Sequence, residues 1–147
     1  MMSKTEARER CVLLFFEAEQ KGQKVSEIVE ELKVPPEPYC SMLIKEYEIN
    51  EENVIEQIED NIKNWSSDRL PAIDRAVLRM AITELLRSDE TPVGTIISES
   101  VKLCENYSTD DSPRFVNGVL STIAHKVRTV EMLKKIESST LENSEEN

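Results

Sequence analysis

The residue types that usually carry catalysis are scarce in this chain. The sequence has one histidine, His125, and three cysteines, Cys11, Cys40 and Cys104. A single histidine in a helical run is usually a structural or surface residue, because acid–base catalysis and metal binding both need partner groups at a matched spacing. The cysteines are odd in number, widely separated and form no CxxC pair. This spacing favours reduced, buried thiols over a disulfide framework or a metal site.

The common catalytic and phosphate-binding motifs are also missing. We find no GxSxG, GxxxxGKS/T, GxGxxG or HExxH pattern. The adjacent carboxylates Asp110 and Asp111 lie among Ser, Thr and Pro, which is typical of a loop that caps a helix. The sequence therefore predicts a binding protein that is not an enzyme, with no metal and no cofactor.

The overall charge restricts what such a protein can bind. Acidic residues outnumber basic ones by 29 to 18, which gives a net charge of −11. A protein that binds nucleic acid by charge alone is normally basic. Any contact with nucleic acid must therefore come from a local cationic patch or from a surface shared with a partner.

Two arginines near the N-terminus are candidates for such a patch. Arg8 and Arg10 fall at the start of the first predicted helix, where a positive charge opposes the helix dipole. Pairing with Glu6 or Glu9 is one explanation for them, and contact with a partner is the other.

The elements that must position these side chains are helices, of which residues 70–86 form the most strongly patterned. No Gly or Pro occurs between Ala72 and Thr91, and Pro71 fits a helix start. Apolar residues recur at steps of three and four and form a broad arc: Ile73, Val77, Leu78, Met80, Ala81, Ile82, Leu85 and Leu86. This breadth predicts a central helix with several neighbours.

The rest of the chain also has helical periodicity. Helices are predicted over residues 4–20, with Thr5 as N-cap, and over 25–32, 39–47, 54–65, 93–107 and 115–127. Gly118 inside the last of these suggests a close helix neighbour, and Asn117 a hydrogen bond between helices. The prediction is an all-α fold of about seven helices and no strand. One compact domain covers residues 1–137, and an acidic disordered tail covers 138–147.

The sequence shows neither a membrane-spanning segment nor the pattern of a signal peptide, and this sets the expected location of the protein. No apolar run approaches the roughly 20 residues that span a bilayer. The first ten residues, MMSKTEARER, lack the order of a signal peptide. We therefore expect a cytoplasmic protein that does not enter a membrane.

Three segments resemble the NusB family of bacterial transcription antitermination factors. They are DRAVLRMA at residues 74–81 with Glu84-Leu85 following, ISESVKL at 97–103, and SPRFVNGVL at 112–120. The spacing between them also agrees with the family, and residues 7–10, ARER, resemble the family's opening A-R-E. Similarity covers about residues 5–20 and 65–125, whereas residues 21–64 agree only in helical character.

The resemblance implies a fold and a function. The fold is a single all-helical domain built from two packed helical subdomains. The function is transcription antitermination, in which such a protein pairs with the small-subunit ribosomal protein NusE. The pair binds boxA-type single-stranded RNA in nascent ribosomal RNA transcripts, within the transcription elongation complex. A homodimer is also known in this family.

The resemblance also implies roles for particular residues. Those expected at the RNA are Lys4, Arg8, Arg10, Phe16, Arg114 and Phe115, although Phe115 also suits a place in the core. Those expected on the surface that faces the ribosomal protein are Asp68, Asp74 and Glu99. Bases of single-stranded RNA stack on aromatic rings and guanidinium planes while cations follow the phosphates.

Departures from the family pattern leave two alternatives open. Glu6 and Glu9 dilute the basic N-terminal segment, and Ser98 and Ser100 replace the usual Asn and Ala. Fewer phosphate contacts mean weaker binding, so we expect RNA affinity to depend on a basic protein partner. One alternative is a protein-interaction module of this fold with weakened or lost RNA binding. Another is the helical RNA-positioning domain attached to some RNA methyltransferases, although we expect no catalytic domain after the acidic tail.

Overall fold

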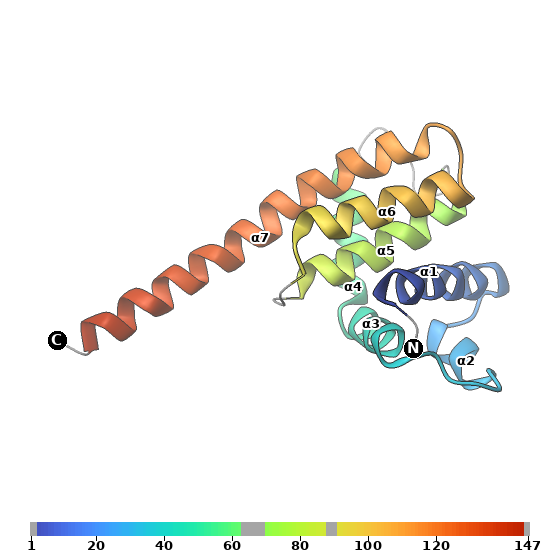
Figure 1. The fold of residues 1–147 in the computed structure, drawn as a ribbon, viewed down its shortest axis with the longest axis horizontal. Helices are drawn as coiled ribbons and strands as arrows, with labels where there is room; N and C mark the ends of the chain where they lie inside the picture. Colours follow the sequence, from blue (N-terminus) through green and yellow to red (C-terminus); the bar gives the residue numbers. More distant parts are fainter. Residues whose placement is uncertain (1–2, 63–69, 88–90, 146–147) are drawn as a thin grey trace.

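The structure is a computed structural model that describes residues 3–62, 70–87 and 91–145, with side chains as far as residue 128. These residues contain seven helices. The helices are α1 (Lys4–Lys21), α2 (Val25–Glu30), α3 (Pro38–Ile49), α4 (Glu51–Asn61), α5 (Ala72–Leu86), α6 (Val93–Tyr107) and α7 (Ser112–Glu145) (Figure 1). The described residues contain no strand, and the all-α prediction is confirmed.

Helix α5 is the centre of the fold, as its broad apolar arc predicted. It packs against α1, α3, α4, α6 and α7. Ten of its residues are buried, and they point to every side of the helix. Figure 1 shows α1, α2 and α3 on one side of α5, with α6 and α7 on another. These two groups of helices bury one continuous apolar core that includes Val12, Leu43, Leu78 and Ile123.

The ends of α1 follow ordinary capping chemistry, but the cap is not the one expected. Ser3 is the N-cap, and the amide of Glu6 donates to its Oγ at 3.2 Å. Thr5, the cap predicted from sequence, lies inside the first turn and uses its hydroxyl elsewhere. At the other end Gly22 adopts a left-handed φ of 64°, which closes the helix without the steric penalty of a Cβ.

Helix α7 is much longer than the segment 115–127 predicted from sequence. It begins at Ser112 and continues to Glu145, through most of residues 138–147, which the sequence analysis assigned to a disordered tail. No Gly or Pro follows Gly118, so the local sequence contains no residue that would force a helix to end. In Figure 1 the second half of α7 extends away from the other helices.

Candidate nucleic-acid and partner interface

Arg8 lies inside the protein and not on its surface. Its side chain is 3% exposed, and Nε donates to Oε1 of Glu84 at 2.7 Å and to Oε2 at 3.1 Å. Burial alone would lower the pKa of Arg8, but the hydrogen bond and the charge of Glu84 raise that pKa above its ordinary value. Direct contact between Arg8 and RNA, expected from the resemblance, does not fit this geometry. Arg8 also does not pair locally with Glu6 or Glu9, because its carboxylate partner is Glu84, 76 residues further along the chain.

Tyr39 completes this buried cluster and brings Lys4 to it. The Tyr39 hydroxyl donates to Oε1 of Glu84 at 2.7 Å. Lys4 Nζ lies 5.0 Å from the centroid of the Tyr39 ring, and Arg8 Cζ lies 5.7 Å from it. Burial, followed by the bond to Glu84, raises the pKa of Tyr39 to about 12. Sequence reasoning missed Tyr39, because it falls in the region where only helical character was recognised.

The start of α1 is also tied to α6. The Thr5 hydroxyl donates to Oε1 of Glu99 at 2.7 Å, and Arg8 Nη1 lies 3.9 Å from the same oxygen. The side chain of Glu99 is 18% exposed. Part of this carboxylate therefore remains accessible to a partner, although its main contacts are internal.

Asp74, which the resemblance assigned to the partner surface, is a buried structural residue. It is 1% exposed and accepts hydrogen bonds from Ser108 Oγ at 2.6 Å and from Ser112 Oγ at 2.8 Å. These bonds hold the loop between α6 and α7 against α5. The expectation that Asp74 faces the ribosomal protein is wrong for this geometry, because the carboxylate has no access to a partner. Asp68 lies outside the described residues.

The charged residues of the DRAVLR segment thus hold helices together. Arg75 Nε donates to Glu19 Oε1 at 2.8 Å, and Arg79 Nη1 donates to Glu19 Oε2 at 3.2 Å, which joins α5 to α1. Asp74 in the same segment holds the start of α7. The two arginines of this segment therefore bind α1, whereas its aspartate binds both ends of the α6–α7 connection.

The other expected RNA residues are divided between two places. Lys4 and Arg114 are exposed, at the first turns of α1 and α7 respectively. Arg10 is half-buried, and its Nε is buried with no hydrogen-bond partner among the described residues. Phe16 and Phe115 are half-buried and pack against the core. Their rings are thus only partly available for stacking.

A tyrosine that the sequence analysis assigned no RNA role connects these two places. Tyr107, at the end of α6, is 42% exposed, and its hydroxyl donates to Oε1 of Glu9 on α1. Residues 108–111 follow it and lead into α7, on which Arg114 lies. Helices α1 and α7 both pack against α5, and α6 lies between them in Figure 1. The exposed Tyr107 ring therefore lies between α1, which it contacts at Glu9, and the connection that leads to Arg114.

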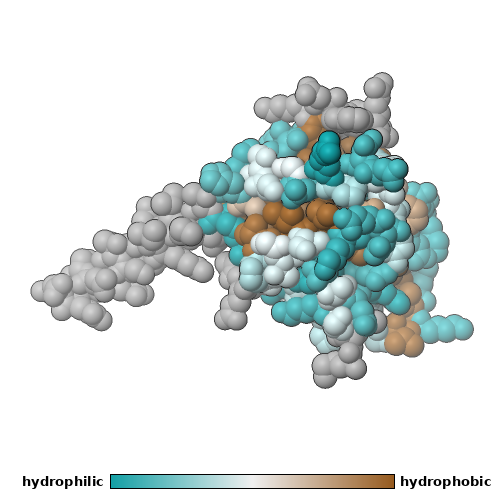
Figure 2. All heavy atoms as spheres, turned by 45° about the horizontal axis from the view of Figure 1, so that its top comes forward, coloured by the Kyte–Doolittle hydropathy of each residue, from teal (hydrophilic) through white to brown (hydrophobic). Residues whose placement is uncertain are grey.

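Two residues of α7, Asn117 and Gly118, do not make the contacts that the sequence predicted. Gly118 is exposed, and a Cβ added there would meet nothing within 4 Å. Asn117 is exposed and accepts a weak hydrogen bond from Ser121, in the same helix, at 3.5 Å. The expected close helix packing at Gly118 and the expected bond between helices at Asn117 are absent, and both residues face solvent. Figure 2 shows a short hydrophobic band, bordered by polar residues, on the side that carries α6 and α7.

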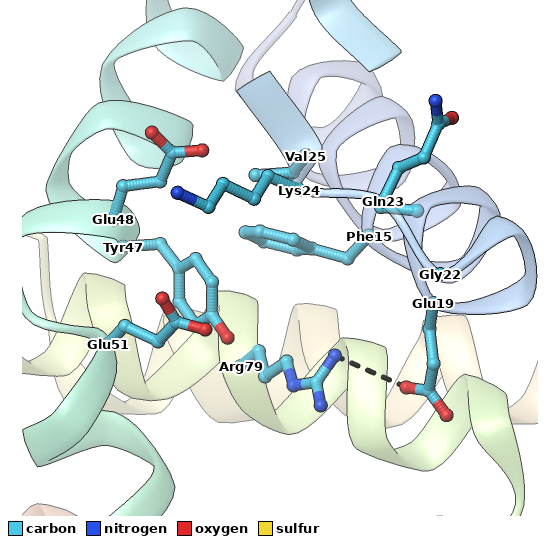
Figure 3. Close-up of a pocket in the computed structure, with 11 residues that line it drawn as sticks. Phe15, Glu19, Gly22, Gln23, Lys24, Val25, Tyr47, Glu48, Glu51 and Arg79 are labelled. Carbon is cyan, nitrogen blue, oxygen red and sulfur yellow. Dashed lines mark hydrogen bonds and ion pairs between the residues drawn. The ribbon is translucent and has the colours of Figure 1, made fainter. Parts of the chain in front are cut away.

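A pocket of about 420 Å³ lies at the opposite end of α1, where that helix meets α2, α3 and α5 (Figure 3). Phe15 and Tyr47 contact each other edge to face on its wall, with ring centroids 4.7 Å apart. Lys24 points between Phe15 and Glu48, and Arg79 pairs with Glu19. Charges of both signs therefore line this pocket, and none of the residues predicted to bind RNA is among them.

These features define a class of protein: an all-helical protein with a central helix, α5, in which two of the predicted RNA cations, Lys4 and Arg114, are exposed at the first turns of α1 and α7. Within the described residues, no helix combines the length and the apolar character needed to cross a bilayer. The sequence pattern of the NusB family matches residues 5–125, and the chain belongs to that family.

A named relative and a solved structure, each aligned over most of its length, support this family assignment. The chain is 37% identical over 128 residues to a protein named transcription antitermination protein NusB from Thermobifida fusca, with 84% of this chain and 90% of the relative aligned. The solved structure of T. maritima NusB matches with a TM-score of 0.75 at 27% identity, over 84% of this chain and 92% of that one.

A second solved structure includes a protein partner and RNA. It contains the antitermination factors NusB and NusE in complex with double-stranded RNA. The match has a TM-score of 0.69 at 26% identity and covers 84% of this chain and 96% of the matched chain.

Proposed function

We propose that this protein is a transcription antitermination factor. In this proposal it pairs with the ribosomal protein NusE, and together they bind boxA RNA in nascent ribosomal RNA transcripts within the elongation complex. The observation that carries the proposal is the likeness, over almost the whole matched chain, to a NusB solved with NusE and RNA. The proposed role is one of binding without catalysis, and it places the protein in the cytoplasm.

The surface proposed for RNA runs from the start of α1 to the start of α7. Lys4, Arg10 and Arg114 supply the cations, and Tyr107 supplies an exposed ring on which a base can stack. Phe16 and Phe115 border this surface with half-buried rings. Arg8 contributes indirectly, because its pairing with Glu84 fixes the helix that carries Lys4 and Arg10.

The surface proposed for the ribosomal protein includes Glu99 on α6 and an exposed stretch of α7. Glu99 keeps part of its carboxylate accessible, and Asn117 and Gly118 present an open stretch of α7. A net charge of −11 favours encounter with a basic partner. RNA affinity of the chain alone is expected to be low, since the proposed RNA surface draws on three cations, Lys4, Arg10 and Arg114, and each missing phosphate contact removes part of the salt-dependent affinity.

A second candidate is a protein-interaction module with weakened RNA binding. The burial of Arg8 favours it, because this removes one of the few N-terminal cations from the surface. A gel-shift with boxA RNA and a scrambled RNA, each with and without NusE, separates the two candidates. Antitermination requires boxA affinity that exceeds scrambled affinity and rises on addition of NusE. Partner binding with no preference for boxA supports the interaction module. Sedimentation at several concentrations shows whether a homodimer competes with either complex.

A further inference from the structure

The ring of Tyr39 lies close to two cations from the first two turns of α1. Lys4 Nζ is 5.0 Å and Arg8 Cζ is 5.7 Å from its centroid, both within the range of a cation–π contact. Lys4 and Arg8 are four residues apart and so share one face of the helix. Tyr39 itself comes from the first turn of α3, so this contact joins two helices that are distant in sequence.

The orientation of this ring is fixed by the buried ion pair behind it. Glu84 accepts the Tyr39 hydroxyl at 2.7 Å and Arg8 Nε at the same distance, with a single oxygen serving both donors. Glu84 is fully buried and Arg8 nearly so, which leaves little freedom to either group. The hydroxyl of Tyr39 is therefore held inside while part of the residue remains accessible.

Lys4 needs such a contact to have a defined position. It is exposed, and a lysine in the first turn of a helix is unfavourable because the N-terminal end of the helix dipole is positive. A free lysine also loses rotamer entropy when it is ordered. The negative face of an aromatic ring offsets both effects and places the ammonium group beside the cluster, with its other side open to solvent.

We propose that Tyr39 is a positioning residue for RNA binding, which holds the Lys4 ammonium group at the surface where it contacts a phosphate. This inference rests on the proposed function and assigns to α3 a part in RNA binding. Tyr39 itself does not contact RNA in this proposal. The aromatic ring makes the contact with Lys4. Packing against the core holds the ring in place, and the hydroxyl bond to Glu84 adds to this.

The variants Tyr39→Leu, Tyr39→Phe and Lys4→Gln test this proposal in the complex with NusE. Binding of boxA RNA is measured at several salt concentrations. Tyr39→Leu should weaken binding about two- to fivefold, because the cation–π contact is lost. Lys4→Gln should lower the slope of log affinity against log salt by about 0.7, the value for one phosphate of a single strand. Tyr39→Leu in the Lys4→Gln background should have no further effect on RNA affinity.

Tyr39→Phe separates positioning from stability. It keeps the ring and should retain RNA affinity, even though loss of the bond to Glu84 lowers the free energy of unfolding. Lys21→Gln is the matched charge control, since Lys21 is an exposed lysine at the far end of α1, paired with Glu17. It should leave the salt slope unchanged. Equal RNA affinity and salt slope in folded Tyr39→Leu and wild type would overturn the proposal.

An NMR measurement on the free protein distinguishes this failure from failure of the proposed function. Ring current from Tyr39 should shift the Lys4 ε-methylene protons upfield in wild type and in Tyr39→Phe, and not in Tyr39→Leu. Absence of this shift in wild type overturns the placement of Lys4. The shift together with no boxA binding by the NusE complex overturns the proposed function, and with it the RNA role of Lys4, but not the contact between the two side chains.

Discussion

Arg8 and Glu84 form a buried ion pair that joins the first helix to the end of the central one, with Nε and Oε1 2.7 Å apart and side-chain exposures of 3% and 0%. Such a pair requires both partners, because a single charge left in the interior is poorly solvated. The two residues belong to segments that resemble the family, the opening ARE and the E-L that follows DRAVLR. The structure thus explains them as internal contacts between helices.

Breaking this pair is expected to destabilise the fold strongly. Arg8→Met leaves Glu84 buried without its cation, which should lower the free energy of unfolding by about 3–5 kcal/mol. Glu84→Gln keeps an acceptor for the Tyr39 hydroxyl but loses the charge that pairs with Arg8. It should therefore also lower the free energy of unfolding. Urea unfolding of the two single variants and of the double variant measures the coupling. If the effects of the single variants simply add, the two residues are not coupled and the pair is not a shared interaction.

Asp74 should act as a structural anchor for the start of α7. Asp74→Ala removes the acceptor of the Ser108 and Ser112 hydroxyls, and Ser112 is 2% exposed. The cost should be about 1–3 kcal/mol in urea unfolding, the usual range for a buried donor left without a partner. Asp74→Asn should cost less, since it keeps one acceptor oxygen. A side chain on a partner surface would instead give near-wild-type stability in both variants together with weaker NusE binding.

Stability should fall as the pH rises from about 9 to about 12. Burial, helped by nearby Asp74, raises the pKa of Cys104 to about 12 from an ordinary value of 9.0, and that of Tyr39 rises to about 12 from 10.0. In this window the unfolded chain has already lost protons that the folded chain retains, so the free energy of unfolding decreases with pH. Cys104→Ala should flatten the decrease above pH 9, and Tyr39→Phe should flatten it above pH 10. A free energy of unfolding that is constant across this window would contradict the burial of both groups.

Two glycine-to-alanine changes should have opposite signs. Gly22 has a φ of 64°, so Gly22→Ala forces a left-handed alanine and should cost about 1–2 kcal/mol. Gly118 lies in a helix with open space around it, so Gly118→Ala should stabilise the free protein by up to about 1 kcal/mol. Thermal or urea unfolding gives both values. Destabilisation by Gly118→Ala would indicate a close neighbour that the structure does not contain.

Gly118→Ala also tests the exposed face of α7. If the partner approaches the α7 backbone at this glycine, the alanine variant should bind NusE more weakly while being the more stable protein. Unchanged NusE affinity would place the partner elsewhere.

Much of the fold could be predicted because the helices are amphipathic and punctuated by Gly and Pro. The periodicity of residues 70–86 identified the central helix, and residues 93–107 were predicted with the bounds that α6 has. The end of α7 could not be predicted in this way. Its acidic, apolar-poor sequence predicts a disordered tail, although that sequence contains no Gly or Pro that would force a helix to end.

The candidate site was harder to predict, because its contacts join residues far apart in the chain. Residue type alone does not tell whether an arginine faces a phosphate or a carboxylate 76 residues away, as Arg8 does. The resemblance drew attention to Arg8 and Asp74, but a sequence motif does not distinguish internal from external contacts. Tyr39 carried no local signal, since only the folded arrangement brings its ring to Lys4.

Hydrogen–deuterium exchange on the complex of this chain with NusE, measured before and after addition of boxA RNA, tests most directly where RNA lies. The first turns of α1 and α7 contain amides without partners inside the helix, so contact with RNA should slow their exchange measurably. We expect RNA-dependent protection in residues 3–10 and 107–115, and none in residues 47–56 at the opposite pocket. Protection confined to residues 47–56, or no change in either cationic segment, would contradict the proposed RNA surface.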